Sequence, residues 1–263
     1  MGLVHRVGWD PALCNRSPWF WPLQAAAAHF AQHADWPTRA ELGEVYAKHT
    51  HGLGLSVAPL TFSDNVKKRD KRADGRVVIS ALYDARITLA RQVPTRERDW
   101  HDLLNMLCFT TFPHSKLALH ARQYTVLTER LNENTTRLPN RRTPEQDTLT
   151  LFDEGGVLVA VSAQAALQLE AADAAQRETL AQELHEQRQL RVVPFGHALY
   201  EHLVEGLRCP GGCTQIIVVS ELWADTSVFL HELDRELAKR LKSRDLLCSP
   251  VECGQIRLAA FAL

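Results

Sequence analysis

The chain has 263 residues, a length that suits one large domain or two small ones. Hydrophobic residues make up 45% and charged residues 23%, which excludes wholesale disorder, collagen-like repeats and a coiled coil. The formal net charge is −1, so no strong overall basic field favours nucleic-acid binding. Residues 1–150 hold 20 basic and 15 acidic side chains, so a peptide or nucleic-acid partner would meet that segment first.

The sequence shows no sign of a membrane partner. No stretch reaches the ~18 consecutive apolar residues of a membrane-spanning helix. Residues 1–17 lack a continuous apolar segment, so they do not predict a secretory signal peptide. We therefore expect a cytoplasmic protein, and the oligomeric state stays open.

Helical patterns predominate along the chain. We expect helices over residues 19–30, 38–48, 78–91, 100–112, 114–132, 163–169, 174–187, 195–205 and 227–241. Short strands are expected at residues 191–193 and 216–219. Two β-rich runs flank Asp153-Glu154-Gly155-Gly156, and the glycines suit a tight turn.

The predicted fold class is therefore α+β, helix-dominated, with a small sheet containing a β-hairpin near residues 148–162. We expect a single domain over residues 1–263. The alternative is a helical lobe over residues 1–143 and an α+β lobe over residues 144–263.

The first polar cluster lies in an apolar segment that begins at Trp100. His101 and Asn105 are four residues apart and share one face of the expected helix. Histidine serves as an acid, a base or a metal ligand, and Asn105 would orient it or bind substrate. Asp102 instead suits the first turn of a helix that Asp99 caps.

The second cluster belongs to the expected hairpin. Alternation along a strand would place Asp147 and Asp153 at the two ends of one face. Carboxylates at strand ends are common in metal and acid–base sites. Asp153 and Glu154 would equally serve as turn residues.

The third cluster follows a glycine at a predicted strand-to-helix junction. His197 and Glu201 are four residues apart, so they share a helical face. Such a pair forms an acid–base dyad, ligates a metal or makes a surface ion pair. His114 and His120 flank Lys116 and would supplement the first cluster.

Two close cysteine pairs occur late in the chain, Cys209 with Cys213 and Cys248 with Cys253. Their spacing loosely fits a structural zinc site. A disulfide and free thiols are the alternatives.

These motifs together resemble a family of uncharacterised bacterial proteins, domain of unknown function 3025. The matching segments are Pro94-Thr95-Arg96, Trp100 to Asn105, Phe112-Pro113 with Lys116, Asp147 to Glu154 with Gly156, and Phe195 to Glu201. The resemblance covers residues 78–205 well, and the cysteine pairs lie outside it. It implies a bacterial cytoplasmic protein and no established reaction.

The first functional hypothesis is a hydrolase acting on a phosphoester or nucleotide-like substrate. Its catalytic candidates are His101, Asn105, Asp147, His197 and Glu201. Its substrate-binding candidates are Arg96, Trp100, Lys116 and Arg122. A divalent metal, if one is used, would be held by His101, Asp153, Glu154 and His197.

The second hypothesis is a binding or structural module whose polar residues form a buried hydrogen-bond network. A lesser alternative is a nuclease of the ββα-metal kind, suggested by the order of His101, Asn105 and His114. The exposure of the polar side chains distinguishes the hydrolase from the binding or structural module. A catalytic cluster lines an open pocket, whereas a structural network is closed and each of its polar groups is paired.

Overall fold

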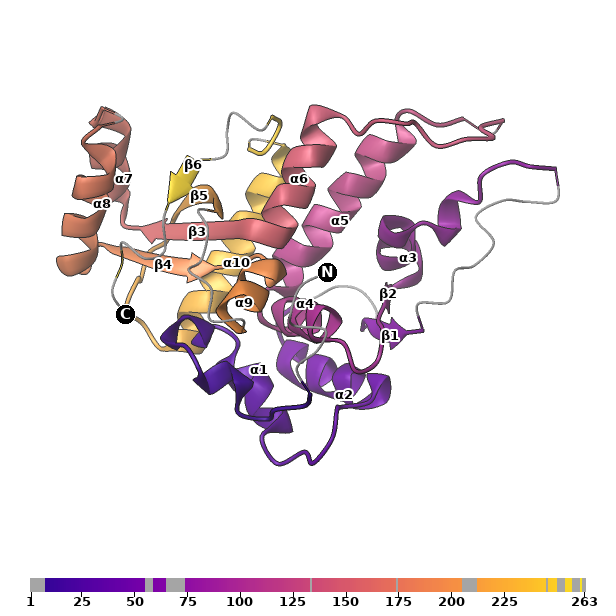
Figure 1. Ribbon diagram of the computed structural model, residues 1–263. Helices are drawn as coiled ribbons and strands as arrows, with labels where there is room; N and C mark the ends of the chain where they lie inside the picture. Colours follow the sequence, from indigo (N-terminus) through magenta and orange to yellow (C-terminus); the bar gives the residue numbers. More distant parts are fainter. Residues whose placement is uncertain are drawn as a thin grey trace.

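A computed structural model describes residues 8–54, 59–64, 74–132, 134–173, 175–204, 212–244, 246–249, 254–256 and 261. The fold is α+β with a predominance of helix, as predicted (Figure 1). No helix in these ranges is long and apolar enough to cross a membrane.

The first half of the chain is mainly helical. Its elements are α1 (Gln24–Ala27), α2 (Arg39–Thr50), β1 (Thr61–Ser63), α3 (Tyr83–Ala90), β2 (Gln92–Pro94), α4 (Trp100–Thr111) and α5 (Pro113–Thr128). The single helix expected over residues 19–30 is instead α1 between two short 3₁₀ segments, Pro18–Phe20 and Ala28–Phe30.

The second half supplies the larger sheet and the remaining helices. Its elements are α6 (Pro144–Gly155), β3 (Gly156–Val161), α7 (Ala163–Ala171), α8 (Arg177–Glu186), β4 (Leu190–Pro194), α9 (His197–Val204), β5 (Gly212–Val218), α10 (Thr226–Ser243) and β6 (Gly254–Ile256).

The hairpin predicted near residues 148–162 is wrong. Its first half is the helix α6, which begins with a capping box between Thr143 and Gln146 and has proline at its first position. Only the second half is a strand, β3, and its partners β4 and β5 come later in the chain. Asp147 and Asp153 therefore lie on a helix and do not mark the ends of one strand face.

Two sheets are present in the described ranges. β1 and β2 form a parallel pair, and the larger sheet has the order β4-β3-β5-β6. β3 runs antiparallel to β4 and parallel to β5, and every residue of β3 is buried. A strand buried on both faces requires helices on both sides of its sheet.

Three hydrophobic clusters provide that cover. Leu158 and Ala160 of β3 face a cluster that includes side chains of α5, α6 and α10. Val157 and Val159 face the other side, where α7, α8 and α9 supply the apolar contacts. The third cluster joins α1, α2 and α4 to Tyr200 of α9. Helix α9 thus connects the sheet to the amino-terminal helices, while the number of domains stays a prediction.

A close contact between backbones fixes the start of α9. The N–H groups of Phe195 and Gly196 both donate to the carbonyl of Gly156, at 2.9 Å each. A Cβ atom at Gly196 would lie 2.3 Å from the carbonyl oxygen of Glu154, so only glycine fits. His197 therefore follows directly from the point where β4 meets the end of α6.

Candidate functional site

A pocket opens where α3, α4, α5, α6 and α9 meet, with a volume of about 370 Å³. It is lined by Tyr83, Asp84, Pro94, Arg96, His101, Asp102, Asn105, His120, Gln123, Arg142, Thr150, Asp153, Glu154 and His197. Residues from all three predicted clusters thus line one pocket. This size is within the usual range for small-molecule sites.

A pair of histidines forms the centre of the site. The Nε2 atoms of His101 on α4 and His197 on α9 lie 3.2 Å apart, and the two rings meet at 82°. Nδ1 of His101 is hydrogen-bonded to the carboxylate of Glu201, one turn after His197. Nδ1 of His197 donates to the backbone carbonyl of Asp153 at 2.9 Å. His197 and Glu201 share a face as predicted, but both contact His101 and not each other.

These hydrogen bonds assign the protons. Each Nδ1 faces an oxygen acceptor, so each carries a proton. Two neutral rings would then direct the lone pairs of both Nε2 atoms at each other. One additional proton between the Nε2 atoms relieves that repulsion, and it makes one ring an imidazolium.

The environment assigns the additional proton to His101. Its hydrogen bond to Glu201 raises the pKa of His101, although partial burial opposes the shift. Burial lowers the pKa of His197 to about 3, despite the nearby Asp153 carboxylate. When the additional proton is bound, it therefore lies on Nε2 of His101, which donates it to a neutral His197.

Below the histidine pair lies a buried ion pair between Lys116 and Asp153. The Lys116 side chain is fully buried, and its ammonium group lies 4.8 Å from the centre of the Phe109 ring. Burial alone would raise the pKa of Asp153, but the positive charges around it, chiefly that of Lys116, hold this pKa below its usual range. The pair therefore keeps a fixed carboxylate beside His197.

A further part of the pocket wall contains a second carboxylate–histidine pair, in which Nε2 of His120 lies 4.0 Å from Asp153. Nδ1 of His120 on α5 donates to Asp84 of α3 at 2.9 Å. Beside it, the Asn105 amide donates to the Tyr83 hydroxyl at 3.2 Å. Two buried polar atoms on this wall have no hydrogen-bond partner, Nε2 of His120 and Oδ1 of Asn105. The network is therefore open and only partly paired.

Three predicted site residues lie away from the pocket. Asp147 is exposed in the first turn of α6. Trp100 is buried, and its ring packs 4.7 Å from that of Trp36, centre to centre. Arg122 is buried, pairs with Glu145 at 2.7 Å and donates to the Leu246 carbonyl at 2.7 Å. These contacts give Trp100 and Arg122 packing roles.

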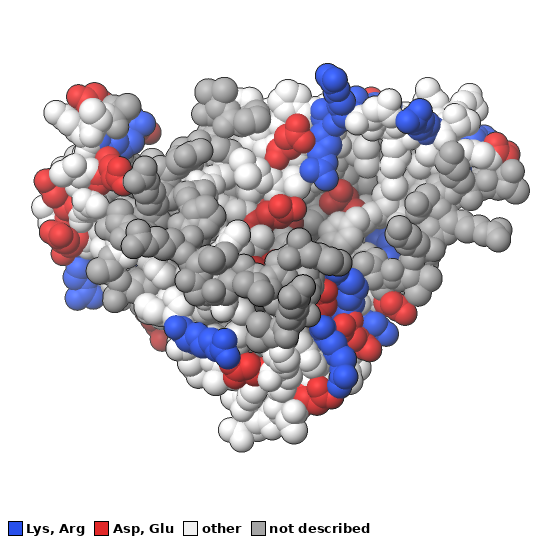
Figure 2. Space-filling view, viewed as in Figure 1, with Lys and Arg blue, Asp and Glu red and all other residues white. Residues whose placement is uncertain are grey.

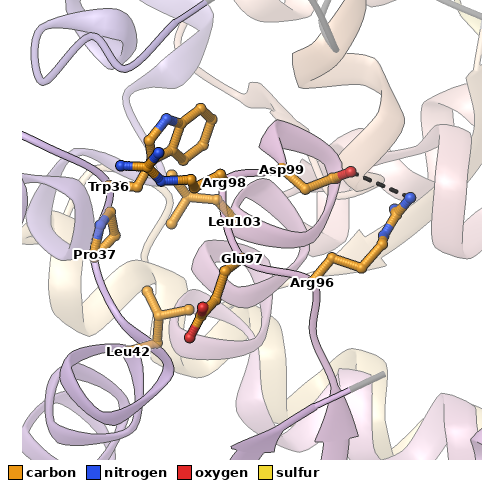
Figure 3. A pocket seen from close by; sticks show the side chains of 8 residues that line it. All are labelled: Trp36, Pro37, Leu42, Arg96, Glu97, Arg98, Asp99 and Leu103. Atoms are coloured by element: carbon orange, nitrogen blue, oxygen red, sulfur yellow. Dashed lines mark ion pairs between the residues drawn. The ribbon is translucent and has the colours of Figure 1, made fainter. Parts of the chain in front are cut away.

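Arg96 lines the pocket, but its charge is already paired. Its guanidinium donates to both carboxylate oxygens of Asp102, at 2.9 and 3.0 Å, and lies 3.2 Å from Asp99. Figure 3 shows the ion pair between Arg96 and Asp99, which line a second cavity together with Trp36. That cavity measures about 10 Å³, room for about one water molecule, so it is no substrate site. Asp99 also caps α4 by accepting the Asp102 N–H, as predicted.

The structure gives the metal hypothesis little support. In the described ranges, no group of three or more His, Cys, Asp or Glu side chains is arranged to hold a metal ion. The Asp153 carboxylate binds Lys116, and Glu154 is an exposed residue of the pocket lining.

The predicted zinc site lacks one of its four thiolates. Cys213 is disulfide-bonded, and a sulfur atom in a disulfide is not a thiolate ligand. Cys248 is exposed, and its thiol donates to the Arg244 carbonyl at 3.2 Å. Cys209 and Cys253 lie outside the described residues.

The ββα nuclease interpretation is wrong. That motif needs a hairpin before its helix, whereas β2, which precedes α4, pairs in parallel with β1. Its second histidine, His114, binds Asp234 of α10 at 2.9 Å and does not line the pocket.

Residues 73–253 match a family described as "Protein of unknown function (DUF3025)". The chain belongs to this family. The DUF3025 match extends past residue 205, where the resemblance was expected to weaken, and its range includes the positions of both cysteine pairs. No curated protein and no solved structure matches the chain. Function must therefore be argued from the pocket itself.

Sequence reasoning missed five residues of the pocket, Tyr83, Asp84, Gln123, Arg142 and Thr150, and the first two and Arg142 matter most for its chemistry. Tyr83 and Asp84 begin α3, where they read as an ordinary helix start. Arg142 lies in a polar loop before α6, a place where a surface arginine is common. Only the fold brings these three side chains to the histidine pair's pocket.

Proposed function

We propose that this protein is a hydrolase in which His101 is the general acid for a substrate bound in the pocket of α3, α4, α5, α6 and α9. The observation that carries the proposal is the 3.2 Å approach of the Nε2 atoms of His101 and His197 at the edge of an open pocket, a geometry that accommodates one additional proton. The His101 side chain is 33% exposed, so a bound substrate can reach its ring. His197 is almost fully buried, so it serves to position His101.

The hydrolytic step requires a proton for the leaving group and a base for water. The leaving oxygen replaces His197 as the acceptor of the His101 Nε2–H and takes this proton as the bond between that oxygen and the attacked centre breaks. Water supplies the new bond, and its proton passes to Glu154. Glu154 suits this role because it lines the pocket and no described cation pairs with it. Afterwards Glu154 releases its proton to solvent and His101 regains one, and Glu201 stabilises the charged ring.

The substrate is proposed to carry an anionic group such as a phosphate. The cations first expected to bind it are already neutralised, Arg96 by Asp102 and Lys116 by Asp153. Arg142 is the better candidate because it lines the pocket, is exposed and forms no ion pair with a described carboxylate. Figure 2 shows basic side chains above the amino-terminal end of α6, interspersed with acidic ones.

The position of Arg142 also defines the shape of the substrate. Arg142 precedes α6, whereas Asp153 and Glu154 lie in the last turn of that helix. A rise of about 1.5 Å per residue puts the backbones of Arg142 and Glu154 roughly 18 Å apart. Both side chains line one pocket, so this span sets the longest substrate, of nucleotide-like size, that could contact Arg142 and Glu154 together.

Hydrolysis of p-nitrophenyl phosphate, bis-p-nitrophenyl phosphate and p-nitrophenyl acetate tests the proposal. We expect turnover of at least one substrate, and a loss of about 10²-fold or more in His101→Gln. The matched control is His202→Gln on the same helix as His197, because His202 does not line the pocket. Absence of turnover by the wild type, or equal rates in wild type and His101→Gln, would overturn the proposal.

A divalent metal is the second candidate, because metal-binding histidines commonly donate their other ring N–H to a carboxylate or a carbonyl. His101 and His197 do so, to Glu201 and Asp153 respectively. Calorimetric titration with Zn²⁺ tests it. Stoichiometric binding that is lost in His197→Gln would support this candidate, and absence of heat would exclude zinc from the site.

A further inference from the structure

The part of the pocket wall formed by Asn105, Tyr83 and His120 contains unused hydrogen-bonding capacity. Asn105 and His120 are 6% and 1% exposed, and both line the pocket. Each leaves one polar atom, Oδ1 and Nε2 respectively, buried without a hydrogen-bond partner, and Nε2 of His120 lies 4.0 Å from the Asp153 carboxylate. A buried polar atom of this kind destabilises a fold, so native proteins rarely keep one without a purpose. Two such atoms on one pocket wall point to a ligand that completes them.

Neighbouring contacts hold both side chains in place. Nδ1 of His120 is bound to Asp84, and the ring stacks on Phe109 at 5.3 Å between centres. The Asn105 amide nitrogen is bound to the Tyr83 hydroxyl, and the Tyr83 ring packs edge-on against His120 at 5.6 Å. Tyr83 thus contacts both residues, and the two unpartnered atoms belong to one subsite.

The hydrogen bonds also fix the chemistry of the subsite. Because the Asn105 amide nitrogen faces Tyr83, its free atom is the carbonyl oxygen, an acceptor. His120 donates Nδ1–H to Asp84, and its Nε2, which lies 4.0 Å from the Asp153 carboxylate, is a second polar atom open to a ligand. The Asp84 carboxylate accepts this N–H, and its negative charge disfavours an anionic group at this part of the pocket.

We infer that Asn105, Tyr83 and His120 form a specificity subsite for an uncharged part of the substrate that carries O–H or N–H donors. Vicinal hydroxyl groups of a sugar or polyol fit this description, as does an amide. Asn105 lies one helical turn after His101, so the recognised group lies next to the bond to be cleaved. The inference rests on the proposed function only in taking this pocket as the substrate site.

Two phosphates that differ only in their hydroxyl groups test this subsite. Glycerol 3-phosphate carries two hydroxyls, and propyl phosphate carries none. We expect calorimetry to show that the wild type binds glycerol 3-phosphate about fivefold more tightly or better, the effect of one net hydrogen bond. The preference should disappear in Asn105→Leu, which removes the acceptor while keeping the side-chain volume.

Two further variants make the test specific. Gln123→Leu is the matched control, because Gln123 also lines the pocket but is only half-buried and has no unpartnered buried atom. It should retain the preference. Tyr83→Phe removes only a hydroxyl from a side chain that is 40% exposed, so it should fold and should weaken the preference.

Each result decides the inference. Equal affinity of the two phosphates for the wild type, an unchanged preference in both Asn105→Leu and Tyr83→Phe, or no binding of either phosphate would overturn it. Loss of p-nitrophenyl ester hydrolysis is a separate result. If the wild type shows the binding preference but hydrolyses none of the esters, the subsite is supported and the proposed hydrolase function is refuted.

Discussion

The Nε2 atoms of His101 and His197 lie 3.2 Å apart, although the two residues are separated by 96 positions in the sequence. Their Nδ1 atoms are held by Glu201 and by the backbone of Asp153, so neither ring can turn without losing a hydrogen bond. One proton between the rings satisfies this geometry. A proton held next to an open pocket is the property that makes the site suitable for acid–base chemistry.

The first prediction concerns the charge partner of His101. Glu201→Gln should lower the pKa of His101, because the carboxylate that favours the imidazolium is replaced by a neutral amide. Titration of the ring nitrogens by nuclear magnetic resonance measures this pKa. Glu154→Gln is the control and should have a much smaller effect. An unchanged pKa of His101 in Glu201→Gln would contradict the assignment.

The second prediction concerns stability in acid. The pKa of His197 is about 3 in the folded protein and near 6.5 in the unfolded chain, so the unfolded state binds one more proton between these values. Stability contributed by neutral His197 is therefore present above pH 6.5 and declines as the pH falls toward 3. The slope from one proton is about 1.4 kcal/mol per pH unit.

Urea unfolding across this pH range measures the effect. His197→Gln should reduce the slope by up to one proton, since the amide does not titrate. His202→Gln should leave the slope close to that of the wild type. The assignment fails if the two variants show the same pH dependence.

The third prediction concerns the buried pair of Lys116 and Asp153. Asp153→Asn leaves the fully buried Lys116 charge without its partner, so it should destabilise the protein by about 3–5 kcal/mol. Adding Lys116→Met should restore much of the loss, because the uncompensated charge is then gone. Chemical denaturation of the three proteins checks this, and additive losses in the double variant would refute it.

The fourth prediction concerns the approach of β4 to α6. Gly196→Ala would place a Cβ atom 2.3 Å from the Glu154 carbonyl oxygen and 2.5 Å from the Gly156 nitrogen. Backbone atoms cannot yield without moving His197, so a destabilisation of about 1–3 kcal/mol is expected. Gly155→Ala meets no atom within 4 Å and serves as the control. Equal melting temperatures of the two variants would contradict the prediction.

Much of the helical framework could be predicted from the sequence. The expected helix from Trp100 is present as α4, and Asp99 caps it as its position suggested. The strand at residues 191–193 lies within β4. These signals are local, because a cap or an apolar period depends only on nearby residues.

The error at α6 shows the limit of local propensity. Thr148 and Thr150 favour strands, and the glycines after Glu154 look like a hairpin turn. The capping box of Thr143 and Gln146 and the buried positions 148, 149, 152 and 153 follow a helical period instead. Burial of these positions against the rest of the protein therefore favours the helix over a strand.

The candidate site was only partly predictable for a different reason. Histidine, asparagine and carboxylate residues inside apolar segments marked His101, Asn105, Asp153 and His197, and all four line the pocket. Nothing in the sequence indicated that Arg122 is bound by Glu145 or that Tyr83 contacts Asn105. These contacts join elements that are far apart in the sequence, so no spacing between the residues in a single sequence predicts them.

The protonation of the histidine pair is the most direct test of the central claim, and ¹⁵N resonance of the ring nitrogens at neutral pH measures it. The account predicts that His101 is protonated on both nitrogens and that His197 is protonated on Nδ1 only. A neutral His101, or a proton on Nε2 of His197 with none on Nε2 of His101, would contradict it.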